Sequence, residues 1–367
     1  MIVGIDLGTT NSLVGVYQDG QVKLIPNAFG EYLTPSVVAL DDNDEIIVGK
    51  IAKERLVTHP DKTVSQFKRF MGTKHELTLG NRAYKAEELS SFIIRKLVDD
   101  AETYLGEKVE EVIVSVPAYF NDAQRYATKL AGKFAGVQID RIINEPSAAA
   151  LAKRSMVNQE DQSFIVVDFG GGTLDISVVE LFDNIVEIVS IAGDNRLGGE
   201  DFTAAIAEEF LVSNQLTKDT ISREFYSKIL VQAEKTKLEL NSKEEVKMTV
   251  LDQDQEYTLD LSYQRFYELC QPLLARVKAV LDRALMNARY SYVSSDNFVL
   301  VGGTSKLRLV QDFLSYCINQ VVQVSDDPDR MIARGCALLA GIKERQGEIR
   351  DLLLSDICPF TLGIEIV

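Results

Sequence analysis

The chain has 367 residues, of which 46% are hydrophobic and 26% are charged, and its formal net charge is −16. This length is too great for one simple domain, and the composition is that of a globular protein. The negative charge argues against a nucleic-acid partner, because a nucleic acid is itself a polyanion. A nucleotide would have to be bound through local dipoles, a metal ion and a few lysines.

The termini, apolar segments and cysteines exclude further classes. A strand is predicted to begin at Ile2, which leaves no room for a signal peptide, and no apolar stretch approaches the roughly 18–20 residues of a membrane span. We therefore expect a soluble, cytoplasmic protein with no membrane partner. The cysteines share no ligand spacing, so buried small hydrophobes are favoured over disulfides or a zinc site. They are Cys270, Cys317, Cys336 and Cys358.

One pattern occurs twice, first as IVGIDLGTTNSLVGVY and later as FIVVDFGGGTLDISVVEL. In each, an apolar strand ends in an aspartate, small residues form a turn, and a second strand returns. Backbone N–H groups of such turns can close around an anion. Two facing turns could hold the two ends of a polyphosphate, and the aspartates its metal. The aligned pairs are Asp6 and Asp168, Gly8 and Gly170, Thr9 and Gly171, and Thr10 and Gly172.

In the first half, a long helix is predicted over 84–106 from its helical apolar period. A strand follows over 110–117, and then a helix that begins at Asn121 and Asp122 and ends at Gly136.

The second half repeats this order. It carries helices over 200–213 and 222–240, a hairpin over 244–261, a long helix over 262–289, a strand over 296–303 and a helix starting near Lys306. Insertions are expected at 36–85 and 198–270. The sequence thus predicts a duplicated α/β unit whose two lobes enclose a ligand-binding cleft.

The glycine-rich turns differ from two common phosphate loops. No Gly-Lys-Ser/Thr follows the glycines, as a Walker A loop requires, and GGGT leads into a strand where a dinucleotide-binding fingerprint would open a helix. Either turn alone could be an ordinary hairpin turn, but two aligned copies favour nucleotide binding. Magnesium is usually held by one or two carboxylates plus phosphates, a role that Asp6, Asp168 and Asp175 fit. Each of them alone could instead cap a turn.

Six motifs occur in a fixed order: GIDLGTTNS, VSVPAYFNDAQR, RIINEPSAAALA, VVDFGGGTLDIS, AGDNRLGGEDF and VLVGGTSK. Through them essentially the whole chain resembles the nucleotide-binding domain of the heat shock protein 70 chaperone family. The strings NAFGEYLTPS and SDICPFTLG are most similar to the HscC-type bacterial branch. The resemblance implies an actin-like ATPase fold, with ribonuclease H-like duplicated lobes, that hydrolyses ATP to ADP with Mg²⁺ and K⁺.

The resemblance also implies a domain organisation. The nucleotide-binding domain would span 1–350, with lobe I at 1–158 and lobe II at 159–350. An interdomain linker would follow at 351–356, and 357–367 would begin a substrate-binding domain that the chain leaves incomplete. Implied partners are a J-domain co-chaperone and unfolded polypeptides; whether a nucleotide exchange factor is used stays open.

The resemblance assigns roles around the phosphates. Asp6, Asp168 and Glu145 would order the Mg²⁺ shell and the attacking water, and Asp6 and Asp175 would help to bind K⁺. Lys68 would reach the γ-phosphate, although a solvated surface lysine is the alternative. The residues implied to contact or line the phosphate site are Gly8, Thr9, Thr10, Asn11, Gly170, Gly171, Gly172, Thr173 and Gly198.

The adenosine pocket is implied to differ from the family pattern. Two family arginines that sandwich adenine are replaced by Leu238 and Lys306, and a serine by Asn241. Since arginine stacks on a flat ring better than lysine does, a looser clamp is expected. Without the resemblance, the i, i+3 pair Glu234 and Lys237 would be interpreted as a surface ion pair. The matching pocket residues are Gly199, Glu234, Lys237, Gly302, Gly303 and Asp329.

The resemblance implies that Pro117 and Arg125 relay between the nucleotide site and the linker. We expect the run 352–354 to dock as a strand on a sheet edge, with Asp356 as its anchor and Leu353→Asp as the disrupting substitution. Two alternatives share the phosphate turns. A sugar kinase would need a sugar pocket with a catalytic aspartate, and a filament-forming protein would not be expected to end in such a linker.

Overall fold

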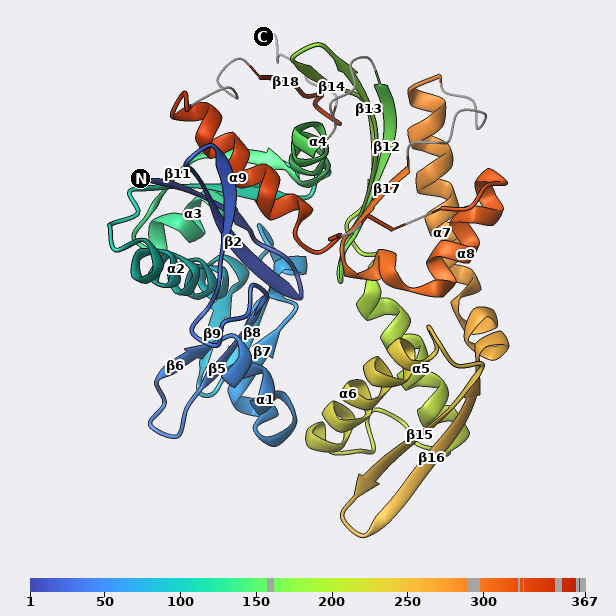
Figure 1. The fold of residues 1–367 in the computed structure, drawn as a ribbon. Coiled ribbons are helices and arrows are strands. Elements are labelled where there is room, and N and C mark those ends of the chain that lie inside the picture. The colour runs from blue at the N-terminus through green and yellow to red at the C-terminus, as the bar shows by residue number, and fades with distance from the viewer. Residues whose placement is uncertain are drawn as a thin grey trace.

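The computed structural model describes residues 1–156, 162–289, 298–322, 324–325, 327–346, 352–360 and 363. Its chain forms two lobes, each built on a central sheet (Figure 1). The predicted mixed α/β fold is confirmed. The predicted lobe boundary at 158–159, residues 296–297 of one predicted strand and the linker start at 351 fall outside the described residues.

The two central sheets share one strand pattern. In lobe I the order is β11 (Gln138–Asn144), β10 (Glu111–Val116), β1 (Ile2–Asp6), β2 (Asn11–Gln18) and β3 (Gln21–Ile25), with the short β4 (Thr34–Pro35) also paired to β2. In lobe II it is β17 (Phe298–Val301), β12 (Gln162–Phe169), β13 (Leu174–Phe182), β14 (Ile185–Asp194) and β18 (Leu353–Ser355).

Strand directions complete the match between the sheets. β1 runs parallel to β10 and antiparallel to β2, and β12 runs parallel to β17 and antiparallel to β13. A parallel bridge between Leu300 and Val324 lies where lobe I has β11. Asp6 and Asp168 therefore stand at the same end of equivalent strands, as the sequence repeat predicted.

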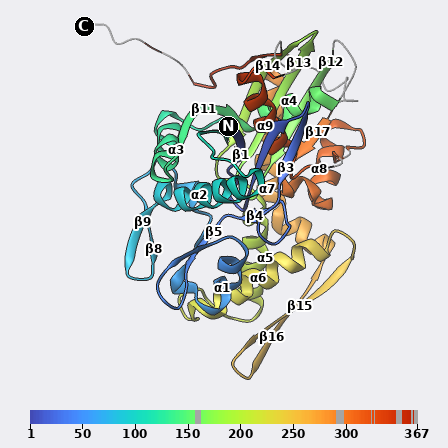
Figure 2. The same cartoon turned by 60° about the vertical axis from the view of Figure 1, so that its left-hand side comes forward.

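Two helices cross between the lobes. Helix α9 (Met331–Lys343) belongs to the second half of the sequence but packs on β1, β2 and β10 of lobe I. Helix α4 (Glu145–Met156) belongs to the first half and contacts β12 to β14 as well as its own lobe (Figure 1, Figure 2). The helices also pack on each other. A Cβ added at Gly335 would lie 1.8 Å from the carbonyl oxygen of Ala148, so only glycine permits this crossing.

The remaining long helices cover the outer faces of the sheets. Helix α2 (Ala86–Leu105) packs on α3 (Asp122–Phe134), and Asn121 caps α3 by accepting a hydrogen bond from the backbone N–H of Gln124. Helix α7 (Tyr263–Asn287) packs on β13 and β14. The predicted helix near Lys306 is α8 (Arg308–Ile318), which begins later because Gly303–Lys306 forms the 3₁₀ turn η3.

Each insertion forms a unit beyond its central sheet (Figure 1). The first contains β5 (Val37–Leu40), β6 (Ile46–Val48), α1 (Lys50–Thr58), η1 (Pro60–Lys62), β7 (Thr63–Ser65), η2 (Phe67–Phe70), β8 (Glu76–Leu79) and β9 (Arg82–Lys85). The second contains α5 (Gly199–Ser213), α6 (Arg223–Glu239) and the hairpin of β15 (Glu245–Asp252) and β16 (Gln255–Ser262).

The cysteines only partly match the expectation of burial. Cys270 and Cys336 are buried and Cys317 is half-buried, but Cys358 is exposed, so the expectation is wrong there. Cys358 lies in the short segment that follows β18. In the part of the chain that the structure describes, no helix is long and apolar enough to cross a membrane.

The helix crossing generates a stability prediction. Gly335→Ala should lower the free energy of unfolding by at least about 2 kcal/mol, because the new methyl group meets a backbone atom that cannot move alone. Gly132→Ala in α3 is the matched control, since its Cβ would meet only the side chain of Ile139. Urea titration of both variants measures the difference; equal losses would contradict tight α4–α9 packing.

Candidate functional site

A cavity of about 390 Å³ lies in the cleft and receives residues from both lobes. Most of the residues predicted from the sequence line it, which brings together positions up to some 320 residues apart in the chain. They are Asp6, Gly8, Thr9, Thr10, Asn11, Lys68, Glu145, Asp168, Gly170, Gly171, Thr173, Gly199, Glu234, Lys237, Leu238, Gly302, Gly303, Lys306 and Asp329. Of the residues predicted for the nucleotide and metal site, four do not line the cavity: Gly172, Asp175, Gly198 and Asn241.

The two glycine-rich turns meet at the centre of the cleft. A Cβ added at Gly171 would lie 1.9 Å from Oγ1 of Thr10, and one added at Gly172 would lie 2.7 Å from the methyl group of Thr9. The absence of side chains in the second turn therefore lets the first turn approach. The two turns face each other, as the repeat predicted.

Other residues of lobe II form hydrogen bonds to the backbone of the second turn. The backbone N–H groups of Gly199 and Glu200 donate to the carbonyl oxygens of Gly170 and Gly171, over 3.1 and 3.0 Å. Oγ1 of Thr304 donates to the carbonyl oxygen of Gly170 over 2.8 Å. The start of α5 thus positions the turn. Gly198, the residue before α5, supports the turn from outside the cavity lining.

A buried ion pair lies beside the turns. Nζ of Lys68 is 2.6 Å from Oε1 of Glu145, and both side chains are almost fully buried. The predicted alternative for Lys68, a solvated surface lysine, is wrong. Nearby, Oγ of Ser115 donates to Oδ1 of Asp6 over 2.8 Å. Lys68 comes from η2, Glu145 from the start of α4, and Asp6 from the end of β1.

Three aspartates crowd this ion pair. Burial and the charge of Glu145 raise the pKa of Asp6 to about 7 and that of Asp175 to about 8, and burial together with the other carboxylates raises the pKa of Asp168 well above its usual value. Oδ2 of Asp168 and both carboxylate oxygens of Asp175 are buried without a hydrogen bond of normal geometry. The backbone N–H groups of Ala118 and Tyr119 lower the pKa of Asp175, but they offset only part of the rise that burial and Glu145 cause.

These acids fit a cation. Removing carboxylates from water without partners is unfavourable, and a positive ion relieves both the lost solvation and the mutual repulsion. Among the described residues, no three His, Cys, Asp or Glu side chains could hold a metal ion by themselves. An ion here would need further oxygen ligands from water or phosphate, which is how magnesium is usually bound.

The far end of the cavity is built from α6 and the 302–307 segment. Nζ of Lys237 donates to the carbonyl oxygen of Gly199 and to Oγ1 of Thr203, both over 2.9 Å, and lies 2.6 Å from Oε2 of Glu234. Because Lys237 is buried, the interpretation as a surface ion pair is wrong. Lys306 pairs with Asp329 at the cavity rim.

Apolar lining comes from Leu238, Leu307, Pro328 and Ile332. Leu238 is 51% exposed, so it offers an uncovered apolar surface to a ligand. Asn241 lies outside the lining, since its Oδ1 accepts the backbone N–H of Arg308 over 2.9 Å. Its amide is therefore engaged at the start of α8, and the prediction that it lines the pocket is not met.

Several lining residues were not predicted. Glu200 directly follows Gly199, and Thr304 follows Gly303, so both could have been found by extending the motifs by one residue. Lys53 reaches the cavity from α1, in the first insertion, and nothing in its local sequence indicates this. Its position depends on how the insertion folds over the cleft.

A second cluster surrounds Asp356, at the end of the predicted linker, and involves residues on either side of Glu145 in the chain. Oδ2 of Asp356 accepts from Nδ2 of Asn144 over 2.9 Å and from Oγ of Ser147 over 2.6 Å. Oδ1 of Asn144 in turn accepts from Nη2 of Arg125 over 2.7 Å. Arg125 also donates to backbone carbonyls that follow Pro117, those of Ala118 and Phe120. Asn144 and Ser147 were not predicted, although they flank Glu145 in the INEPS string.

Strand β18, which lies in the predicted linker, extends the lobe II sheet. It pairs parallel to β14, with Leu353 opposite Ile185 and Leu354 opposite Val186. Leu352 and Leu354 pack on the cluster that joins the lobes, whereas Leu353 points outward and is 62% exposed. The three leucines are therefore not equivalent, because side chains alternate across a strand.

Comparison with known proteins places this site in context. The family model described as "Hsp70 protein" matches residues 2–367. A protein named "Chaperone protein DnaK" from Thermotoga neapolitana is 39% identical over 383 aligned residues, which cover 100% of this chain and 63% of that protein. The chain thus spans about 63% of the length of this relative.

Proposed function

This chain belongs to the Hsp70 family, and on that basis we propose that it binds ATP in the cleft and hydrolyses it to ADP and phosphate as the ATPase domain of a chaperone. Its duplicated α/β lobes are consistent with the actin-like ATPase fold of the family. One observation supports the proposal most: two facing glycine turns converge on a buried lysine–glutamate pair that lies among three buried aspartates.

The phosphates would lie between the two turns. Backbone N–H groups of the turns and the hydroxyls of Thr9, Thr10 and Thr173 supply neutral donors that hold anions without a large positive charge. This matches a chain whose net charge is −16. The adenosine would extend toward Lys237 and Leu238, at the apolar end of the cavity.

Mg²⁺ would be held near Asp6 and Asp168, together with phosphate oxygens, and K⁺ near Asp6 and Asp175. When bound, these ions would neutralise charge on the phosphates and on the buried acids. The orphaned Oδ2 of Asp168 supports this assignment, and so does Asp175, whose burial the N–H groups of Ala118 and Tyr119 offset only in part.

Lys68 and Glu145 would act on the reacting groups. Phosphoryl transfer depends on positioning and charge stabilisation more than on covalent chemistry by the protein. An ammonium has three N–H donors, so Lys68 can keep its bond to Glu145 and still donate to the γ-phosphate. Glu145 would accept a hydrogen bond from the attacking water and orient it.

The linker contacts support a coupling between this site and a following domain. Asn144 and Ser147, which hold Asp356, lie on either side of Glu145 in the chain. A change in linker docking would therefore act directly on the residues that position Glu145. We propose that docking favours one lobe arrangement and that this changes the hydrolysis rate.

As partners we propose a J-domain co-chaperone and unfolded polypeptides, the latter through a substrate-binding domain begun at 357–367. An exchange factor and membership of the HscC-type branch are further proposals from the sequence. A sugar kinase or a filament protein receives no support, because the Hsp70 model matches residues 2–367.

Removing the lysine tests the chemistry. Lys68→Ala should keep ATP binding within a few-fold and lose about 100-fold in single-turnover hydrolysis, since one preorganised electrostatic group is worth about 3 kcal/mol in the barrier. Lys62→Ala, at an exposed ion pair with Asp44, is the control and should hydrolyse at the parent rate. Hydrolysis by Lys68→Ala at the parent rate would remove Lys68 from the site.

The apolar lining tests the position of the base. Leu238→Arg should tighten ADP binding by about 0.5–2 kcal/mol, mostly through slower release, because a stacked guanidinium would replace an exposed leucine. Calorimetry with ADP measures it, and Val231→Arg adds the same charge on an exposed position of α6 as a control. Unchanged affinity in both variants would mean that the base lies elsewhere.

Linker docking is tested by truncation. A fragment ending at residue 356 should hydrolyse ATP faster than one ending at residue 350, under matched salt and potassium. The structure corrects the disrupting substitution: Leu354→Asp should abolish the difference, whereas Leu353→Asp should leave most of it, since Leu353 points into solvent. Equal turnover by the two fragments would show that this linker does not signal to the cleft.

A further inference from the structure

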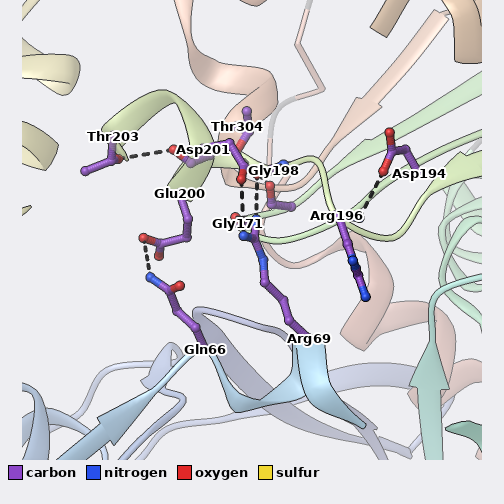
Figure 3. Close-up of polar contacts among 12 residues, drawn as sticks. Gln66, Arg69, Gly171, Asp194, Arg196, Gly198, Glu200, Asp201, Thr203 and Thr304 are labelled. Carbon is purple, nitrogen blue, oxygen red and sulfur yellow. Dashed lines mark hydrogen bonds and ion pairs between the residues drawn. The ribbon is translucent and has the colours of Figure 1, made fainter. Parts of the chain in front are cut away.

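A group of polar side chains joins the two insertions across the cleft, beside the predicted site. Gln66 and Arg69 come from the start of η2 and from η2 itself, and Glu200 and Asp201 from the first turn of α5 (Figure 3). We call these four residues the interlobe clasp. None of them was predicted from the sequence, and the function proposed above does not use them.

The main bond of the clasp is a two-pronged ion pair. Nη2 and Nη1 of Arg69 lie 2.6 and 3.2 Å from Oδ2 and Oδ1 of Asp201. The two side chains are only 18% and 24% exposed. Bidentate, partly buried pairs of this kind are geometrically specific and stronger than solvated ones.

The chain contains a natural comparison. Arg223 and Asp61 also join α6 to the first insertion, over 2.8 Å, but their side chains are 79% and 75% exposed. Exposed pairs contribute little, because water and salt screen them. Both ion pairs span the same cleft. The pair of Arg69 and Asp201 is the less exposed of the two, and it is therefore the one that can hold the cleft closed.

Asp201 also supports the second glycine turn. Its Oδ2 accepts the backbone N–H of Gly198 over 2.7 Å, which fixes the start of α5. The next N–H groups of that helix hold the carbonyl oxygens of Gly170 and Gly171. Nη2 of Arg69 additionally donates to the carbonyl oxygen of Gly171 over 3.4 Å. Arg69 therefore contacts the turn both directly and through the helix that holds it.

On its own side, Arg69 is the neighbour of Lys68 in the same 3₁₀ turn. Lys68 belongs to lobe I and the GGGT turn to lobe II. A bond from residue 69 to α5 consequently fixes how far Lys68 stands from the turn that would hold the phosphates.

Gln66 supplies independent support. Its backbone is left-handed, with φ 59°, which is uncommon for a residue other than glycine and is typically kept where surrounding contacts compensate the strain. Its Nε2 donates to Oε2 of Glu200 over 2.7 Å. Oε1 of Glu200 accepts from Oγ1 of Thr10 over 3.3 Å, so this second bond also ends on a phosphate turn.

We propose that Arg69 is a positioning residue: its pair with Asp201 clamps η2 against α5, which sets Lys68 against the second phosphate turn and limits the escape of nucleotide. The inference rests on the proposed function for its ligand. The geometry that carries it, two elements from different lobes joined by a partly buried pair, does not depend on that function.

The test uses the 367-residue chain and a fluorescent ADP with Mg²⁺. Arg69→Met should release the nucleotide about tenfold faster, which corresponds to about 1.4 kcal/mol. Single-turnover hydrolysis should fall by a similar factor while overall stability changes little. Asp201→Asn should behave alike, because asparagine keeps an oxygen for the N–H of Gly198, and the double variant should release no faster than either single one.

Two further variants separate the clasp from general damage. Arg223→Met is the matched control and should release nucleotide within twofold of the parent, and Arg69→Lys should fall between the parent and Arg69→Met. Parent-like release by Arg69→Met, equal effects of Arg69→Met and Arg223→Met, or additive effects in the double variant would each overturn the proposal.

Hydrogen exchange measured without ligand separates a refutation of the clasp from a refutation of the proposed function. In the ligand-free chain, Arg69→Met should speed exchange of the amides of Gly199 and Glu200, and Arg223→Met should not. A parent chain that binds no ADP would refute the proposed function, and exchange would still decide the clasp. Unchanged exchange at both amides would refute the clasp by itself.

Discussion

Four carboxylates share one buried space with a single lysine, and much of the structure is arranged around this constraint. Asp6, Asp168 and Asp175 have raised pKa values, and Lys68 compensates chiefly Glu145. Left to itself, such a cluster would oppose folding, because buried charges without partners are costly. A cation would offset this repulsion, and it would also bridge the acids to a polyphosphate held between the glycine turns.

The cluster is formed by both lobes. Their central sheets have the same strand order, and the helices α4 and α9 each pack against the sheet of the other lobe. Equivalent strands deliver Asp6 and Asp168 to the floor of the cleft, and α4 and α9 cross there through the close contact at Gly335. The same α4 begins with Glu145 and contributes Ser147 to the linker anchor. The crossing of α4 and α9 therefore lies close in the sequence to both the ion pair and the contact with Asp356.

Much of this arrangement could be predicted from residue patterns. The repeated turn motif gave the duplicated sheets and the facing turns, since strand and turn patterns are local. Contacts made by single polar side chains across the cleft, such as Arg69 with Asp201, could not be predicted, because they depend on how two insertions pack. The alternation that exposes Leu353 and partly buries its neighbours depends on the register of β18 on β14. Asn241 lies outside the cavity lining, where its Oδ1 accepts the backbone N–H of Arg308, a contact between segments far apart in the sequence.

The central claim is that the carboxylate cluster and the glycine turns form one metal–nucleotide site. Calorimetric titration of ADP into the 367-residue chain, with Mg²⁺ and then with EDTA, tests it most directly. The structure predicts saturable binding to one site that weakens at least tenfold when the metal is removed, because the buried acids then repel the phosphates. Binding that is absent, or equally tight in EDTA, would contradict the claim.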